Sequence, residues 1–136
     1  IEKLNWYAMR WKIETFHKIL KSGCKAEDSK MRNAERLTKL ISVFCIMSWR
    51  IFWMTLINRC NENASPKVAL TKVEINLLDH LIKNKRSDVK RKNLSEFIIK
   101  IAKLGGYLAR ASDGPPGNID MWRGLSQLVA IQFGFN

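Results

Sequence analysis

Four side chains near the start of the chain have the types and the spacing needed to hold phosphate groups. Tyr7, Arg10, Glu14 and Lys21 follow one another at intervals of three, four and seven positions. Such intervals place residues on one face of an α-helix, here within an arc of roughly 60°. Arginine makes bidentate phosphate contacts, lysine and tyrosine add donors, and a carboxylate is a ligand that Mg²⁺ prefers. The spacing therefore predicts a phosphate-handling stripe with Glu14 as its candidate metal ligand.

A plainer interpretation of the same stripe stays open. Arg10 and Glu14 are also an ordinary surface ion pair at positions i and i+4, which stabilises a helix by a few tenths of a kcal/mol. His17 and Lys18 lie beside the stripe and surround the carboxylate with further cations. A helical histidine next to lysines is more often a surface residue than a metal ligand, and one carboxylate does not make a metal site. The stripe alone thus leaves a solvated face and a phosphate site as alternatives.

The charge of the whole chain favours a polyanionic partner. The 136 residues include 24 Lys and Arg against 12 Asp and Glu, which gives a net charge of +12. Residues 1–60 carry 12 basic and 5 acidic groups, and residues 61–136 carry 12 and 7. The positive charge is therefore spread through the chain, as in nucleic-acid-binding proteins, although a merely soluble basic protein is the alternative. An apolar content of 46% excludes an intrinsically disordered chain.

Helical periodicity is present through most of the chain, and no strand pattern is visible. Residues 3–21 predict an amphipathic helix that Gly23 ends. Residues 32–58 predict a longer helix, within which residues 40–57 are apolar nearly all round. We interpret that stretch as a central core helix and not a membrane span, because Arg50 in its middle would cost about 3 kcal/mol in a bilayer.

Helix-start signals predict two more helices in the second half of the chain. Thr71-Lys-Val-Glu74 and Asn93-Leu-Ser-Glu96 both have the pattern of a capping box. Gly105-Gly106 ends the second of these helices, and a last short helix follows the turn-rich residues 112–117. The basic run 83–92 is interpreted either as a phosphate-binding segment or as a solvated loop.

The cysteine pattern predicts a reducing compartment. Cys24, Cys45 and Cys60 are odd in number, which argues against a disulfide framework, and their spacing matches no zinc motif. We therefore expect a cytoplasmic location.

Residues 7–23 read Tyr-Ala-Met-Arg-Trp-Lys-Ile-Glu-Thr-Phe-His-Lys-Ile-Leu-Lys-Ser-Gly. This segment resembles the Tyr-x2-Arg-x3-Glu-x6-Lys motif of bacterial DDE transposases of the insertion-sequence-four family, in particular its transposon-five-type branch. Residues 48–53, 101–107, 113–117 and 121–125 are also similar to that family, so the resemblance covers nearly the whole chain. It implies a mainly α chain, with the C-terminal helices of an RNase-H-like catalytic domain in residues 1–60 and a helical dimerisation region in residues 61–136.

The resemblance also implies an activity and its partners. Such enzymes cut and join transposon ends by two-metal phosphodiester hydrolysis and strand transfer, with Mg²⁺ or Mn²⁺ as cofactor. Glu14 matches the catalytic, metal-ligating glutamate of the family. The resemblance makes Tyr7, Arg10 and Lys21 DNA-phosphate contacts and His17 and Lys18 candidate DNA contacts. The implied partners are transposon-end DNA, target DNA and a second copy of the chain in a synaptic complex, with no membrane.

The family's two metal-binding aspartates would lie on strands before the helix that carries Glu14, where this chain begins. We therefore expect the metal to bind only with those aspartates present, and the chain alone to be catalytically inactive. Without a sheet to cover them, the apolar faces of residues 6–20 and 40–57 are expected to stay partly exposed and to promote association. The alternative function is a non-catalytic helical DNA-binding or dimerisation module, or a decayed relic of such a transposase.

Overall fold

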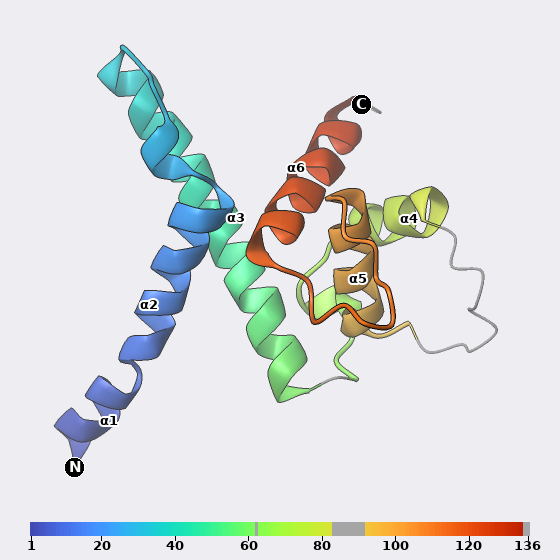
Figure 1. The fold of residues 1–136 in the computed structure, drawn as a ribbon, viewed down its shortest axis with the longest axis horizontal. Coiled ribbons are helices and arrows are strands. Elements are labelled where there is room, and N and C mark those ends of the chain that lie inside the picture. Colours follow the sequence, from blue (N-terminus) through green and yellow to red (C-terminus); the bar gives the residue numbers. More distant parts are fainter. Residues whose placement is uncertain (62, 83–91, 135–136) are drawn as a thin grey trace.

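Figure 1 shows the helices of the chain in a computed structural model, which describes residues 1–61, 63–82 and 92–134. No strand occurs in these ranges, so the mainly α prediction is confirmed for them. The α-helices are α1 (Glu2–Ala8), α2 (Arg10–Lys18), α3 (Ala34–Cys60), α4 (Lys72–Leu81), α5 (Leu94–Leu104) and α6 (Asn118–Gly134). Three short turns of other helix types are η1 (Ile19–Gly23), η2 (Ala26–Asp28) and η3 (Pro66–Val68).

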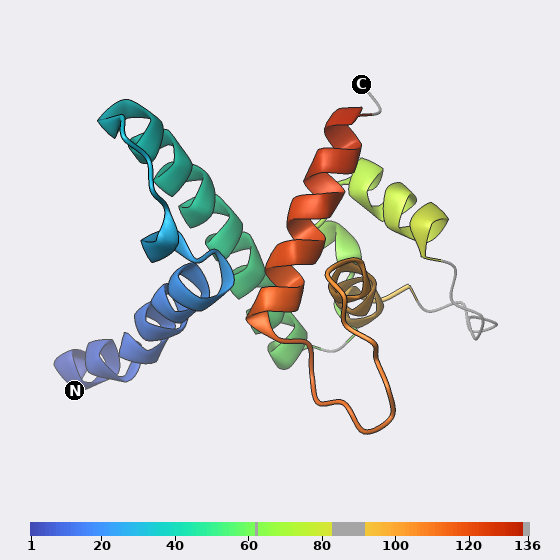
Figure 2. The same cartoon turned by 45° about the horizontal axis from the view of Figure 1, so that its top comes forward.

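Helices α1 and α2, with the turn η1 at their inner end, form an arm (residues 2–23). In both views α1 and α2 extend away from α4–α6 (Figures 1 and 2). One helix was predicted over residues 3–21, but the structure has α1 and α2 separated at Met9 and a π-helical turn, η1, that ends at Gly23. At Met9 the amide donates to the Trp6 carbonyl three residues back, at 3.1 Å. This tighter hydrogen bond replaces one α-helical bond and divides the helix, whereas the stop at Gly23 is confirmed.

Helix α3 begins at the cap residue Asn33, whose side chain accepts a hydrogen bond from the Glu35 amide at 2.8 Å. One face of the helix enters the core through Met47, Ser48, Ile51, Phe52 and Met54. The opposite face is open, with Ile46 62% and Trp49 53% exposed. The prediction of a core helix is therefore right for one face and wrong for the other, because no described element covers that side. The expectation that apolar surface stays exposed is confirmed here and on the arm.

Among the described residues, α3 is the helix with the length and composition to cross a membrane. The core helix of a soluble protein meets the same criterion. Near the middle of α3, Arg50 donates from Nη2 to both carboxylate oxygens of Glu74, at 2.9 and 3.0 Å. The arginine that argued against a membrane span therefore has its partner inside the protein, on α4.

The predicted starts of α4 and α5 are confirmed. The Glu74 amide bonds to the Thr71 hydroxyl and the Thr71 amide bonds to the Glu74 carboxylate, which completes a capping box. The Asn93 side chain accepts from the Glu96 amide at 3.1 Å and begins α5, which ends at Gly105 as expected. Helix α6 is longer than the short helix predicted, since it continues to Gly134.

Helices α5 and α6 cross with their backbones in close approach. A Cβ atom added at Gly124 would overlap the carbonyl of Ile101, and one added at Gly105 would overlap the carbonyl of Asp120. Only glycine fits these two positions, so the crossing depends on a glycine from each helix. Helix α6 also packs on η1, so it lies against the inner end of the arm.

One core joins the arm, α3 and the C-terminal helices. Its members come from both sides of residue 60: Ile19, Met47, Ile51, Phe52, Met54, Ala64, Leu70, Leu78, Leu94, Phe97, Ile98, Ile101, Ala102, Met121, Leu125 and Leu128. In both views α3 lies between the arm and α6 (Figures 1 and 2). The core thus fixes the orientation of α2, which carries Arg10 and Glu14 of the predicted stripe, while most of α2 stays in solvent. The predicted division at residue 60 stays a prediction.

Candidate nucleic-acid interface

The centre of the predicted stripe is a connected, solvent-exposed set of three side chains. The Arg10 guanidinium lies over the Tyr7 ring, with its Cζ atom 5.0 Å from the ring centroid. Its Nε atom is 3.2 Å from Glu14 Oε1, and the side chains of Arg10 and Glu14 are 60% and 61% exposed. The structure thus brings Tyr7, Arg10 and Glu14 together as the spacing predicted. An exposed pair of this kind adds little to stability, so its groups remain available to a ligand.

Lys21 lies in a different local setting from the other three. It is part of the π-helical turn η1, in which the Ser22 hydroxyl donates to the Lys18 carbonyl at 2.6 Å. Lys21 Nζ is 2.9 Å from Glu27 Oε1, so it forms its own exposed ion pair. His17 is exposed, with its ring edge-on to Phe16 at 5.6 Å between centroids. The α-helical extrapolation missed the π-helical turn because such turns have no simple sequence signature.

The described residues do not by themselves fit a divalent-metal centre. Glu14 supplies one carboxylate, and it is held by Arg10. Within residues 1–61, 63–82 and 92–134, no group of three or more His, Cys, Asp or Glu side chains is placed to hold a metal ion. Asp79 binds Lys92 and Lys100, and Asp113 accepts from the Arg110 amide at 2.8 Å. A two-metal site needs several carboxylates, so no catalytic step is assigned to these residues.

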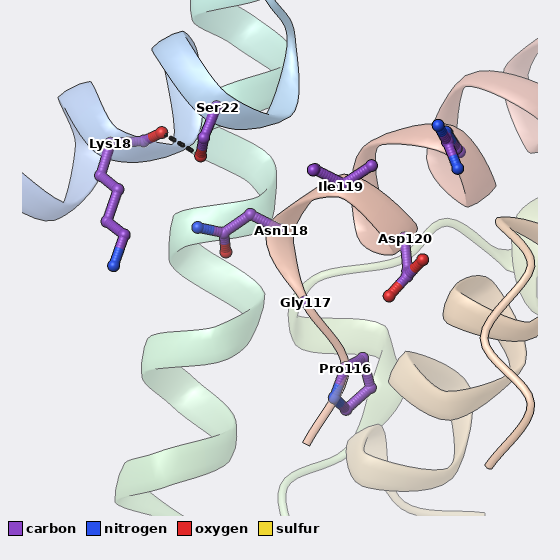
Figure 3. Close-up of a pocket in the computed structure, with 8 residues that line it drawn as sticks. Lys18, Ser22, Pro116, Gly117, Asn118, Ile119 and Asp120 are labelled. Carbon is purple, nitrogen blue, oxygen red and sulfur yellow. Dashed lines mark hydrogen bonds between the residues drawn. The ribbon is translucent and has the colours of Figure 1, made fainter. Parts of the chain in front are cut away.

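Lys18 lies at a hollow where α2, α3 and α6 meet. The deeper part has a volume of about 430 Å³, and its polar lining includes Lys18, Asn58, Arg59 and Asn118. An adjoining, more open part of about 570 Å³ is also lined by Lys18, together with Arg123 and Asp120. Figure 3 shows the Lys18 and Asn118 side chains near one another, with Asp120 further along α6. The sequence analysis did not identify Arg59, Arg123 or the two asparagines.

No local signal in the sequence connects these residues. Arg59 is in the last turn of α3 and Arg123 in the first part of α6, and each lines one of the two parts that Lys18 also lines. The one cue is the Gly114-Pro-Pro-Gly117 segment, which directs the chain into α6 beside the arm. The other predicted basic segment cannot be placed, because residues 83–91 lie outside the described residues. Lys92 is described, and it pairs with Asp79.

The three cysteines are free thiols. Cys24 is buried, with Sγ 3.1 Å from Ser48 Oγ. Burial raises the pKa of the Cys24 thiol, which outweighs the lowering effect of the Ser48 hydrogen bond. The thiol is therefore uncharged near neutral pH and unsuited to act as a nucleophile.

No family model matches the chain. A functional assignment therefore rests on the residues of the stripe, on the hollow beside it and on the positive charge of the whole chain.

Proposed function

We propose that the chain is a DNA-binding helical part of a bacterial DDE transposase of the insertion-sequence-four family. In this proposal residues 1–60 pack against an RNase-H-like sheet of a longer cytoplasmic protein, and residues 61–136 pair two copies in a synaptic complex. The observation that carries the proposal is the exposed Tyr7–Arg10–Glu14 cluster, whose residue types and order match the family motif.

The geometry of the cluster suits contacts to the phosphates of transposon-end DNA. Glu14 occupies the Nε side of the Arg10 guanidinium, and the Tyr7 ring lies under its plane. The terminal N–H groups of Arg10 remain free of this pair and can donate to phosphate oxygens. Lys18, Lys21 and His17 continue the cationic surface along the arm. Glu14 would be one carboxylate of a Mg²⁺ or Mn²⁺ centre completed by residues of the longer protein.

The test is duplex-DNA binding by the chain, followed by fluorescence anisotropy. Arg10→Ala is expected to weaken binding by at least about tenfold, since a charge-assisted hydrogen bond contributes roughly 1.5–3 kcal/mol. Arg36→Ala is the matched control, because Arg36 is an exposed arginine in the first turn of α3, outside the stripe. Equal affinities for the two variants would reject the role of the cluster in DNA binding.

A non-catalytic DNA-binding or dimerisation module is the second candidate function. It is favoured by the lack of any carboxylate cluster around Glu14 among the described residues. Glu14→Gln in a full-length transposase that contains this helix separates the two candidates. Loss of cleavage with DNA binding retained supports the catalytic role, and unchanged cleavage supports the module.

A further inference from the structure

We infer that the hollow between α2, α3 and α6 is a second phosphate-binding site, in which Lys18, Arg59 and Arg123 hold the backbone of a nucleic acid. The inference deepens the proposed function and rests on it for the identity of the ligand. It adds two DNA-contacting arginines that the family motif does not contain, and it places them outside the arm.

Three cations without an ion-pair partner among the described residues lie along the two parts of the hollow. Lys18 on α2 lines both parts, Arg59 on α3 lines the deeper part, and Arg123 on α6 lines the open part. In the part of the chain that the structure describes, none of the three forms an ion pair, whereas Arg10, Lys21 and Lys39 do. All three residues are exposed, so their charged groups are available to an anionic ligand.

The acidic group at the site does not neutralise it. Asp120 lines the open part beside Arg123 without forming an ion pair, and no carboxylate lines the deeper part. Three cations against one carboxylate leave the hollow positive. Because the chain as a whole carries a net charge of +12, an anion is also drawn toward it from solution.

The lining of the deeper part suits a nucleotide better than a small ion. Ile19, Ile98 and Met121 give it an apolar floor, while Lys18 and Arg59 are its cations. A free phosphate would leave this floor unused, but the sugar of a nucleotide can pack on it while the phosphate meets the cations. The volume of about 430 Å³ accommodates such a unit.

Asn58 adds a polar group without a partner. Its Oδ1 atom is buried and makes no hydrogen bond, and the residue lines the deeper part. A buried polar atom without a partner is costly, and a turn of the side chain toward the hollow would give it a partner in the ligand. Because the oxygen and nitrogen of an amide exchange places by a half-turn, Asn58 can either accept from a sugar or base or donate to a phosphate.

The hollow is continuous with the stripe. Lys18 follows Glu14 by four positions on α2, which places the two side chains about 40° apart around the helix. Lys18 therefore belongs to the exposed stripe and to the wall of the hollow at once. A strand that follows the stripe from Arg10 reaches the hollow without leaving the cationic surface, so its next phosphates meet Arg59 and Arg123.

The test compares the salt dependence of DNA binding in two double variants of the chain. Arg59→Ala/Arg123→Ala removes the inferred contacts. Arg36→Ala/Lys72→Ala removes the same charge from exposed positions elsewhere. Each lost phosphate contact lowers the slope of log K against log salt by about 0.9, so the first variant is expected to lose nearly two units and the control much less. Circular dichroism and thermal unfolding establish that both variants fold.

Equal slopes for the two double variants would overturn the inference. The proposed function would still stand if Arg10→Ala weakened binding in the same assay. The two ideas can therefore fail separately.

A second measurement does not depend on DNA. Inorganic phosphate is titrated into the chain while the amide resonances of Asn58, Gly117 and Asn118 are followed by NMR. The expected result is a saturable shift of these resonances that the Arg59→Ala/Arg123→Ala variant lacks. If phosphate shifts them but the chain binds no DNA, the anion site stands and the proposed function fails. If neither phosphate nor DNA has an effect, the site is rejected.

Discussion

The ion pairs of the arm differ from those of the helices that follow it. Arg10 and Glu14 on the arm are both more than half exposed. The Glu74 side chain, which pairs with Arg50 between α3 and α4, is only 4% exposed, and Arg50 is 27% exposed. An exposed pair exchanges its partner for a ligand at little cost, whereas a buried pair cannot open without stranding a charge. The same residue types therefore form a pair that is open to solvent on the arm and a pair that holds two helices together in the core.

A second buried network strengthens this contrast. Lys100 on α5 is buried and bonds to Asp79 at 2.8 Å and to Glu96 at 3.0 Å, while its Nζ lies 4.7 Å from the Phe97 ring centroid. Burial alone would lower the pKa of Lys100, but its carboxylate partners outweigh burial and raise it. Burial alone would likewise raise the pKa of Asp79, but hydrogen bonds from Lys100 and Lys92 lower it. The network joins α4 to α5 through charge.

The largest expected effect comes from removing one partner of the buried pair. Glu74→Ala leaves Arg50 without its carboxylate and deletes half of the capping box of α4. We expect a loss of about 4 kcal/mol in unfolding free energy, since a broken buried pair costs about 3 kcal/mol and a lost cap about 1 kcal/mol. Chemical denaturation measures it. The matched change on the arm, Glu14→Ala, should cost only about 0.5 kcal/mol. Similar losses for the two variants would break the comparison.

A substitution at the glycine crossing of α5 and α6 tests whether the close packing of these two helices holds α6 in place. Gly124→Ala forces its new methyl group against the Ile101 carbonyl, so α5 and α6 must move apart. We expect a loss of about 2 kcal/mol by denaturant unfolding, as for overpacked cores. Gly134→Ala on the same helix adds a methyl group in open space and should change stability by no more than about 0.5 kcal/mol. A neutral Gly124→Ala variant would mean that the two backbones are not in close approach.

The charge network predicts a dependence of stability on pH. Because the pKa of Asp79 is lower in the folded chain, its contribution is complete above the unfolded value near about 3.9 and is lost as the pH falls below it. The raised pKa of Lys100 gives a contribution that is lost as the pH rises past about 10.4. Lys100→Met should weaken the pH dependence of stability at both the acid and the alkaline end. Its change in unfolding free energy should be smaller than that of Glu74→Ala. Denaturation midpoints across the pH range measure this, and parallel profiles for the two proteins would contradict it.

Local signals predicted much of the fold. The Thr71 and Asn93 caps act over a few residues, so the sequence located the starts of α4 and α5. The Tyr7–Arg10–Glu14 cluster was predictable for the same reason, because its three residues lie within eight positions and stay in contact across the break at Met9 between α1 and α2.

The features that the sequence analysis missed depend on distant parts of the chain. Helix packing decides that Arg50 pairs with Glu74. It also decides that Lys18 lines a hollow with Arg59 in one part and Arg123 in the other. Periodicity reports which face of a helix is apolar but not which helix covers it. The exposed side of α3 shows this limit, since its Trp49 and Ile46 look like core residues in the sequence.

The smallest effect on stability should accompany a gain in binding. Glu14→Gln removes a negative charge from the stripe and frees the Nε–H of Arg10, while the exposed position keeps the change in unfolding free energy small. We expect DNA affinity to rise about two- to fivefold at low salt, and less at high salt because exposed charges are screened. Fluorescence anisotropy at two salt concentrations measures both effects. Glu27→Gln is the matched control, since it frees Lys21 from a pair of similar exposure. A lower affinity for Glu14→Gln would show that the Glu14 carboxylate holds Arg10 in position for DNA and does not compete with DNA for it. The exposed pair of the arm would then have a positioning role, as the buried pairs of the core do.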